Sequence, residues 1–258
     1  MSDVRAIGID AGSTTTKAVG VDAEGRARWH LLEETDPRLR LQIERIITIA
    51  REVAGSPAPV VATGHGRRLA AADRSVTEIT CHCKGVYTQT GHGGTLIDIG
   101  GQDSKVIVVG HTGKVANFAM NDKCAAGTGR FLEVAARRLK LDIDAFSDAA
   151  LHAERDRDIS STCTVFAESE IVSLIAEGLP VGEIIAGLHR SLVRRVGALV
   201  RSTGLEKPVM LSGGVAQNAA VRRFLGEELD VEVVVPEHPQ LMGAYGAALI
   251  ALESLSVR

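Results

Sequence analysis

Residues 10–17 read Asp-Ala-Gly-Ser-Thr-Thr-Thr-Lys, and residues 98–105 read Asp-Ile-Gly-Gly-Gln-Asp-Ser-Lys. The aspartate, the first glycine and the lysine all recur 88 residues later, and so does the following turn glycine, Gly25, as Gly113. A repeat at this distance indicates two similar domains, each built on one Gly-rich hairpin. Two such hairpins that face each other, with acidic residues at their strand ends, form a nucleotide cleft. We therefore predict an α/β fold of two related domains with such a cleft between them.

In the first hairpin, Gly12 lets backbone N–H groups approach an anion, and the Ser and Thr hydroxyls add donors. Lys17 can meet a phosphate, and Asp10 at the strand end can hold Mg²⁺ through water. The stretch is not a P-loop, because the Gly-Lys-Ser/Thr ending and the helix that follows it are missing. The alternative is a structural turn rich in Ser and Thr, but the second copy favours a phosphate site. We predict Asp10 as catalytic and, as nucleotide-binding residues, Gly12, Ser13, Thr14, Thr15 and Lys17.

The second hairpin supplies another acidic strand end and a glycine pair. Asp98 and Gln102 can orient the attacking water or the metal. Carboxylates on two opposing hairpins suit a hydrated Mg²⁺, because Mg²⁺ keeps much of its water in proteins. The alternative is a structural Gly-Gly turn. We predict Asp98 and Gln102 as catalytic and Gly100 and Gly101 as cofactor-binding.

A third Gly-rich stretch, residues 211–218, reads Leu-Ser-Gly-Gly-Val-Ala-Gln-Asn and joins a predicted strand to a helix start. Its glycines allow close approach of a flat ligand, and a helix N-terminus favours an anion. Asn218 is also a good N-cap, which is the structural alternative. After two phosphate hairpins, we predict an adenosine site at Gly213, Gly214 and Asn218.

A fourth stretch, residues 121–129, reads Asn-Asp-Lys-Cys-Ala-Ala-Gly-Thr-Gly and leads into a predicted helix. Gly127, Thr128 and Gly129 form another backbone anion site at a helix start. Cys124 precedes this helix and Cys163 precedes the next one. A helix N-terminus lowers the pKa of a nearby thiol and favours the thiolate. The alternative is that both cysteines are small buried apolar residues.

The composition narrows the class of protein. Apolar residues make up 45% of the 258 residues, and the net charge is −3, which argues against nucleic acid or an anionic membrane as the main partner. No apolar run approaches the ~20 residues of a membrane span. The N-terminus enters a strand with no signal peptide, so we expect a cytoplasmic protein whose four cysteines are thiols or metal ligands.

Hydrophobic periodicity and turn residues predict the remaining elements. The predicted strands are 5–9, 17–21, 27–32, 60–62, 95–97, 105–109, 115–120, 208–211 and 231–235. The predicted helices are 37–53, 67–72, 129–139, 164–177, 181–202, 218–228 and 241–252.

The combination of motifs resembles the acetate kinase, sugar kinase, Hsp70 and actin superfamily of ATPases, whose domains are ribonuclease-H-like. Within it, residues 121–132 and 160–170 resemble the activators of 2-hydroxyacyl-CoA dehydratases, which are related to the ATPase subunits of benzoyl-CoA reductases. The resemblance covers nearly the whole chain. It includes residues 239–244, where Gln240 falls on a nucleotide-binding position.

The resemblance implies an ATPase, binding ATP or ADP with Mg²⁺, whose first subdomain is 1–93 plus 241–258 and whose second is 94–240. It also implies one [4Fe–4S] cluster per homodimer, held by Cys124 and Cys163 of each subunit. A cluster of this type takes four cysteine thiolates, and a symmetric dimer supplies four from two per chain. Reduced ferredoxin or flavodoxin would load the cluster. The electron would pass to an iron–sulfur acyl-CoA dehydratase or reductase.

Two other functions are compatible with the same fold. One is a small-molecule kinase, which would need a substrate hydroxyl pocket. The other is an actin-like or chaperone-like assembly protein, which would need insertions that the chain lacks. The run Cys81-His-Cys83 can bind Zn²⁺ with His65 or His92, but its spacing fits no standard finger and a structural role is favoured.

Overall fold

The computed structural model describes residues 3–55, 57–160 and 163–255. The chain divides into two compact units. The first comprises Met1–Gly93, Val109–Ala116 and Pro236–Arg258, and the second comprises Gly94–Val108 and Asn117–Val235.

The first unit is built on a five-stranded sheet in the order β3-β2-β1-β4-β5. Strands β1 to β3 are antiparallel neighbours, and β4 and β5 continue the sheet in parallel. Every residue of β1 is buried, as expected for a central strand covered on both faces. The strands are β1 (Ala6–Ala11), β2 (Thr15–Val21), β3 (Ala27–Glu34), β4 (Val60–Thr63) and β5 (Arg74–Ser75).

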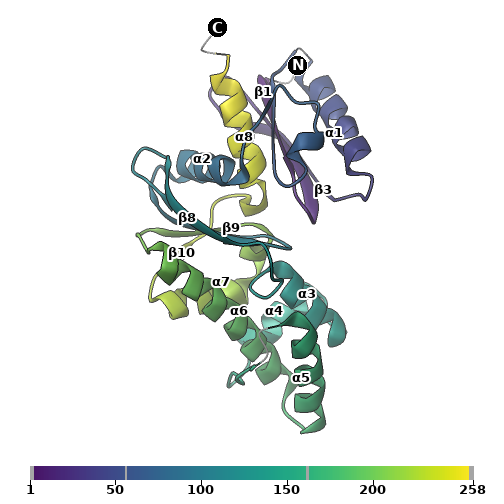
Figure 1. Ribbon diagram of the computed structural model, residues 1–258, viewed down its shortest axis with the longest axis vertical. Helices are drawn as coiled ribbons and strands as arrows, with labels where there is room; N and C mark the ends of the chain where they lie inside the picture. The colour runs from purple at the N-terminus through teal and green to yellow at the C-terminus, as the bar shows by residue number, and fades with distance from the viewer. Residues whose placement is uncertain (1–2, 56, 161–162, 256–258) are drawn as a thin grey trace. The chain divides into compact units, whose positions relative to one another are not determined.

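Helices cover both faces of this sheet (Figure 1). Helix α1 (Leu39–Ala54) packs its buried isoleucines on one face. On the other face lie α8 (Met242–Glu253) and, against it, α2 (Glu78–Thr90). The approach is so close that a Cβ on Gly8 of β1 would collide with the backbone of α8. The missing side chain at Gly8 therefore allows α8 to lie this near the sheet.

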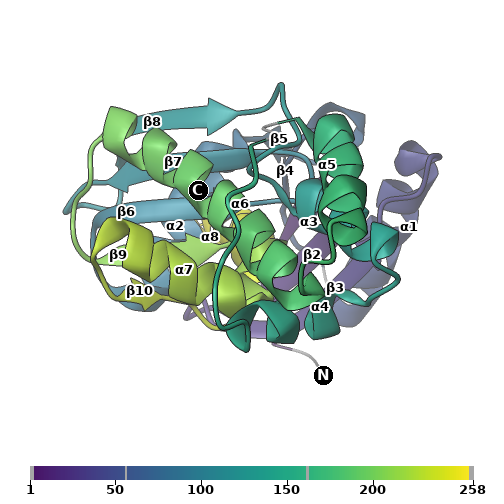
Figure 2. The ribbon, with the colours of Figure 1, turned by 90° about the horizontal axis from the view of Figure 1, so that it is seen from below.

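The second unit repeats this sheet. Its strand order is β10-β9-β6-β7-β8 (Figure 2). Read from the β8 edge, this is the order of the first unit: β6 takes the place of β1, β7 and β8 those of β2 and β3, and β9 and β10 those of β4 and β5. The strands are β6 (Gly94–Ile99), β7 (Ser104–Val109), β8 (Val115–Asn121), β9 (Val209–Ser212) and β10 (Val233–Val234). The internal repeat in the sequence is thus a repeat of the fold.

Among the described residues, five α-helices complete the second unit and share one hydrophobic core with β6, β7 and β9. Helix α3 contacts α5, and α6 contacts α4 and α7. These helices are α3 (Gly129–Arg138), α4 (Ile143–Leu151), α5 (Thr164–Ala176), α6 (Val181–Thr203) and α7 (Ala219–Leu229). Along the described chain, no helix combines the length and apolar character that a bilayer crossing requires.

Most predicted elements are confirmed to within three residues at each end, but the sequence missed two helices, α2 and α4. Helix α2 contains three threonines, two cysteines and a glycine, all poor helix formers. It is stabilised by its Thr77 cap, whose hydroxyl accepts from the Thr80 N–H at 3.4 Å, and by close packing on α8. The predicted helix 67–72 is wrong in length, since only a single 3₁₀ turn forms at Arg67–Leu69. The predicted strand 231–235 is likewise reduced to Val233–Val234.

Candidate functional site

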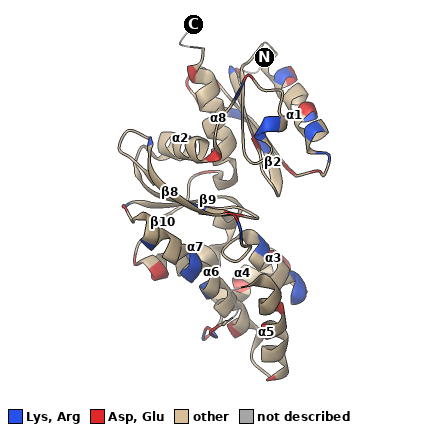
Figure 3. Cartoon of the chain, in the orientation of Figure 1, with Lys and Arg blue, Asp and Glu red and all other residues tan. Residues whose placement is uncertain are grey.

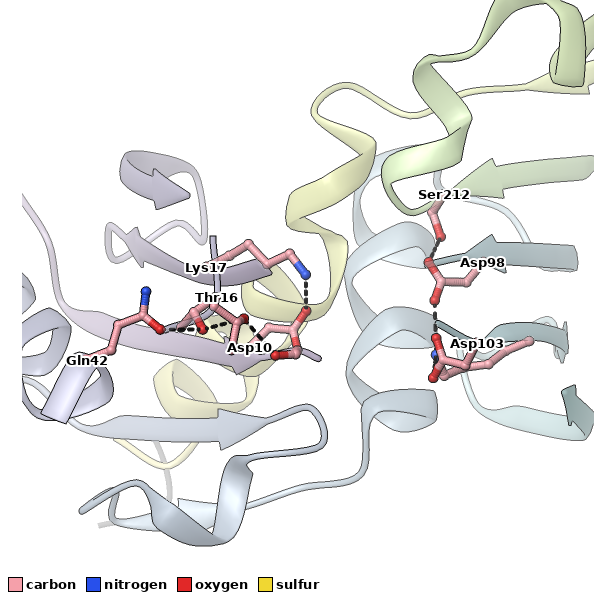
Figure 4. A network of polar contacts seen from close by, with 10 residues as sticks. Asp10, Thr16, Lys17, Gln42, Asp98, Asp103 and Ser212 are labelled. Carbon is pink, nitrogen blue, oxygen red and sulfur yellow. Dashed lines mark hydrogen bonds and ion pairs between the residues drawn. The ribbon is translucent and has the colours of Figure 1, made fainter. Parts of the chain in front are cut away.

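The first Gly-rich hairpin joins β1 to β2 (Figure 4). Asp10 and Lys17 are partners in the strand ladder, and the Lys17 Nζ lies 3.3 Å from the buried Asp10 Oδ2. The turn closes through the Gly12 N–H, which donates to the Thr15 carbonyl at 3.2 Å. A Cβ on Gly12 would lie 2.7 Å from that carbonyl oxygen, so only glycine fits.

The hydroxyls of this hairpin have different surroundings. Thr16 lies inside the unit, where its Oγ1 donates to Gln42 Oε1 at 3.2 Å, and Thr35 donates to the Gly12 carbonyl at 2.9 Å. Ser13 is exposed. The Thr14 Oγ1 is buried and has no hydrogen-bond partner among the described residues. Buried polar atoms are nearly always satisfied, so this hydroxyl fits a donor to a bound group.

Asp10 has a neighbour that the sequence motifs do not predict. A Cβ on Gly243, at the start of α8, would lie 3.0 Å from Asp10 Oδ2 and 2.7 Å from His82 Nε2. The imidazole of His82 on α2 therefore lies beside the Asp10 carboxylate. The sequence placed His82 only in a possible zinc motif. Within the described residues no three His, Cys, Asp or Glu side chains group closely enough to hold a metal ion.

The two cysteines that flank His82 are fully buried. Burial raises the pKa of the Cys81 thiol to about 12 and that of Cys83 to about 11, so both stay protonated at neutral pH. The Cys83 thiol donates to the Gly113 carbonyl at 3.3 Å. These contacts fit the structural role that the sequence favoured.

The second hairpin, between β6 and β7, repeats the acid–lysine pair in a more buried form (Figure 4). The Lys105 Nζ lies 3.4 Å from Asp98 Oδ2 and 2.8 Å from Asp103 Oδ2. The other Asp98 oxygen accepts from Ser212 Oγ at 2.9 Å, which joins this hairpin to β9. Gln102 is exposed on the turn.

The carbonyls of the glycine pair in this hairpin point to the start of α3. Gly100 and Gly101 accept from the backbone N–H groups of Gly129 and Arg130, at 2.9 and 2.8 Å. The Gly129 N–H, which the sequence predicted as part of an anion site, is thus used within the protein. The two bonds hold the hairpin and the stretch before α3 together.

The third Gly-rich stretch follows β9. Gly213 has a φ of 85°, and a Cβ there would collide with the Ile99 carbonyl, so the chain can pass β6 only with glycine. Asn218 is the N-cap of α7, as the structural alternative predicted, and its Oδ1 accepts from the Val221 N–H at 2.9 Å. Gln240 lies partly buried in the 3₁₀ turn Pro239–Leu241.

The Asn218 side chain belongs to a buried network that links three helices. Its Oδ1 also accepts from Ser147 Oγ of α4 at 3.1 Å, and its Nδ2 donates to His189 Nε2 of α6 at 3.1 Å. The His189 Nδ1 lies 2.9 Å from the Ile185 carbonyl. Because Nε2 accepts and Nδ1 donates, this imidazole is neutral.

We expect His189 to make the protein less stable in mild acid. Burial lowers its pKa from 6.5 to about 4, so between those values the unfolded chain takes up a proton that the folded chain does not. The free energy of unfolding should therefore fall by about 3 kcal/mol from pH 6.5 to pH 4. Urea unfolding across this range measures it. His189→Phe should remove this part of the slope, whereas His152→Gln, on an exposed residue, should keep it.

Cys124 lies in an ordered loop between β8 and α3. Asn121 Nδ2 donates to the carbonyls of Cys124 and Ala126, both at 2.9 Å, and Thr128 Oγ1 donates to the Ala125 carbonyl at 2.6 Å. The Cys124 Sγ lies 3.9 Å from the guanidinium Nη2 of Arg195 on α6.

Cys163 occupies the N-cap of α5, the helix that contacts α3. Like Cys124 it is partly exposed, unlike Cys81 and Cys83. The second unit thus offers two accessible thiols. One lies 3.9 Å from the guanidinium of Arg195 and the other lies at the N-terminus of α5.

Comparison with known proteins identifies the family of this chain. Residues 7–251 match the model of the BadF/BadG/BcrA/BcrD ATPase family. The activator of lactoyl-CoA dehydratase from Anaerotignum propionicum is 43% identical, covering 96% of this chain and 97% of its own length. The (R)-2-hydroxyglutaryl-CoA dehydratase activating ATPase of Acidaminococcus fermentans is 41% identical, with 95% and 96% covered.

The fold agrees as well. The structure of the activator of the 2-hydroxyisocaproyl-CoA dehydratase from Clostridium difficile, with bound ADPNP, superposes with a TM-score of 0.89 at 37% identity. The superposition covers 98% of this chain and 96% of that one. The prediction of two actin-like ATPase domains is confirmed. With the repeated acid–lysine hairpins and a family match along almost its full length, the chain belongs to the BadF/BadG/BcrA/BcrD ATPases.

Proposed function

We propose that this ATPase is a reductive activator, which uses ATP to pass a low-potential electron to a 2-hydroxyacyl-CoA dehydratase or a related acyl-CoA reductase. The observation that carries the proposal is the pair of accessible cysteines, Cys124 and Cys163, at the starts of two contacting helices in an ATPase unit. The relatives named above serve three different acyl-CoA substrates. The proposal therefore names the class of acyl-CoA enzymes and no single substrate.

The Gly-rich stretches would bind the nucleotide and its metal ion. ATP would bind with its phosphates against the backbone N–H groups and hydroxyls of the first hairpin. There the buried Thr14 hydroxyl would donate a hydrogen bond to a phosphate oxygen. Gly213 and Gly214 would leave room for the adenosine. Asp10 at the end of β1 would hold Mg²⁺ through water, and that ion would neutralise phosphate charge. Asp98 is the corresponding carboxylate of the second hairpin.

Hydrolysis breaks one bond and forms one. The oxygen of a water attacks the γ-phosphorus, the bond to the β–γ bridging oxygen breaks, and ADP, phosphate and a proton leave. Asp10, beside the Lys17 ammonium, would orient that water. Asp98, beside Lys105, and the exposed Gln102 are proposed for the same role at the second hairpin.

The cysteines fit half of a cluster site. Two thiols per chain, one beside Arg195 and one at the N-terminus of α5, match the donor type and charge that an anionic [4Fe–4S] cluster needs. Such a cluster supplies storage of one electron at low potential. Cys124 and Cys163 of two chains would hold it on the dimer axis, and reduced ferredoxin or flavodoxin would be the electron source.

The surface of α5 supports a homodimer. Apolar residues occur on all sides of α5, an arrangement normal for a buried helix. Yet Val165 and Phe166, next to Cys163, are 66% and 67% exposed, and Figure 3 shows no basic residue on this helix. A second copy placed to complete the cysteine set would cover these side chains.

Iron content and mass together test the proposal. Protein purified without oxygen should be a brown dimer with about four irons per two chains, and should hydrolyse ATP faster when its acyl-CoA enzyme is present. Phe166→Glu should give an iron-poor monomer that still binds nucleotide, because a buried unpaired charge opposes dimerisation. An iron-free wild type that phosphorylates a small hydroxyl compound would instead make the chain a kinase.

A further inference from the structure

We propose that Arg195 is a positioning residue for the cluster, which raises its reduction potential through the sulfur of Cys124. The inference rests on the proposed function. The Arg195 Nη2 lies 3.9 Å from Cys124 Sγ, within the range of a hydrogen bond to sulfur. The two residues are 71 positions apart in the sequence, so α6 delivers the guanidinium to the loop before α3.

The Arg195 side chain is held along its length as well as at its tip. A Cβ on Gly127 would lie 3.3 Å from Arg195 Cδ and 3.6 Å from Cγ. Gly127 has a φ of 87°, a conformation that favours glycine, and its lack of a side chain leaves a path for the arginine stem. Arg195 thus packs on the same loop whose cysteine its guanidinium faces.

That loop is rigid around Cys124. Asn121 binds the carbonyls of Cys124 and Ala126, and Thr128 binds that of Ala125. The loop also joins the second hairpin through the N–H of Gly129. These hydrogen bonds hold the backbone from Cys124 to Gly129, so the contact between the sulfur and the guanidinium is part of the packing of this loop on α6.

The physical effect of this contact has a definite sign. A cluster held by four thiolates becomes more negative when it accepts an electron. A cation that donates to one of its sulfurs stabilises the reduced form more than the oxidised form and so raises the potential. Two-fold symmetry would place one Arg195 at each end of the cysteine set.

The preceding arginine provides a matched control. Arg194 is also on α6, but its guanidinium points to solvent and pairs with the exposed Asp158 at 2.6 Å. Arg195→Gln and Arg194→Gln each remove one positive charge per chain. Only the first removes the donor to Cys124. A general effect of net charge on the potential would appear in both variants. An effect of the contact with Cys124 would appear only in Arg195→Gln.

The test is a redox titration of anaerobically purified dimers, followed by the spectrum of the reduced cluster. We expect Arg195→Gln to keep its iron and to lower the reduction equilibrium constant about tenfold, a shift of about 59 mV to more negative potential. Arg195→Lys should give a smaller shift, because the ammonium keeps the charge without the planar fork. Arg194→Gln should titrate like the wild type.

Other outcomes separate the inference from the function it rests on. Full iron with an unchanged potential in Arg195→Gln would overturn the role of Arg195 and leave the electron carrier intact. Iron loss in both Arg195→Gln and Arg195→Lys would also overturn it, since Arg195 would then serve assembly. Iron loss in Arg195→Gln alone, with a shifted potential in Arg195→Lys, would support it. A wild type without iron would remove the proposed function itself.

Discussion

Replacing Cys124 by serine is expected to remove the iron from the anaerobically purified protein and abolish electron transfer. A serine hydroxyl is not ionised at neutral pH and is a poor ligand for iron in a cluster that takes four thiolates. The loss occurs twice per dimer, so half of the ligand set disappears. Nucleotide binding should stay within about twofold of the wild type, because the contacts of the Gly-rich hairpins do not include this sulfur. Iron analysis and binding of a fluorescent ATP analogue measure the two effects.

The control is the same change at Cys83. That sulfur is buried in the first unit, where it donates to the Gly113 carbonyl, and a serine keeps the donor. Cys83→Ser should therefore retain its iron. A complete cluster in Cys124→Ser would disprove the ligand assignment, whereas loss of iron in both variants would point to general damage to the fold.

Replacing Asp10 by asparagine is expected to slow ATP hydrolysis by about 10²- to 10³-fold, the usual effect of removing one preorganised electrostatic group from an active site. The carboxylate stands at the end of β1, 3.3 Å from the Lys17 ammonium and beside His82. Asparagine keeps its shape but loses the charge that would hold Mg²⁺. The turnover number should fall, and nucleotide binding without Mg²⁺ should change little. Steady-state hydrolysis and calorimetric binding with and without Mg²⁺ separate these effects.

Asp22 offers the matched acidic control in the same unit. It is buried at the turn after β2, where hydrogen bonds from the Arg26 backbone and from the Arg26 and Arg28 side chains overcome its desolvation and lower its pKa to about 2. Asp22→Asn should lower the melting temperature but leave turnover unchanged at temperatures where the protein stays folded. Equal loss of turnover in the two variants would show that the Asp10 effect is structural.

The sequence predicted what local backbone geometry requires. A turn that must bring N–H groups together needs Gly12, and the chain passing β6 needs Gly213, so these positions are readable without a structure. The glycines of the hairpin recur 88 residues later because the same turn forms there, so the repeated motif also predicted the repeated sheet. Asn218 was predicted both as an N-cap and as an adenosine residue, and its cap role is confirmed because capping depends only on neighbours in the chain.

The tertiary structure alone decided which distant side chains meet. His82 lies beside Asp10 only because α2 packs on α8, and α2 itself forms against its own weak helix propensity. Arg195 is one of several arginines on an amphipathic helix, and nothing in its neighbours marks it as the one that reaches Cys124. Local propensity acts over a few residues, whereas these contacts depend on how whole helices pack. The sequence therefore determined the hairpins and the ATPase fold, and only packing determined the groups that surround Asp10 and Cys124.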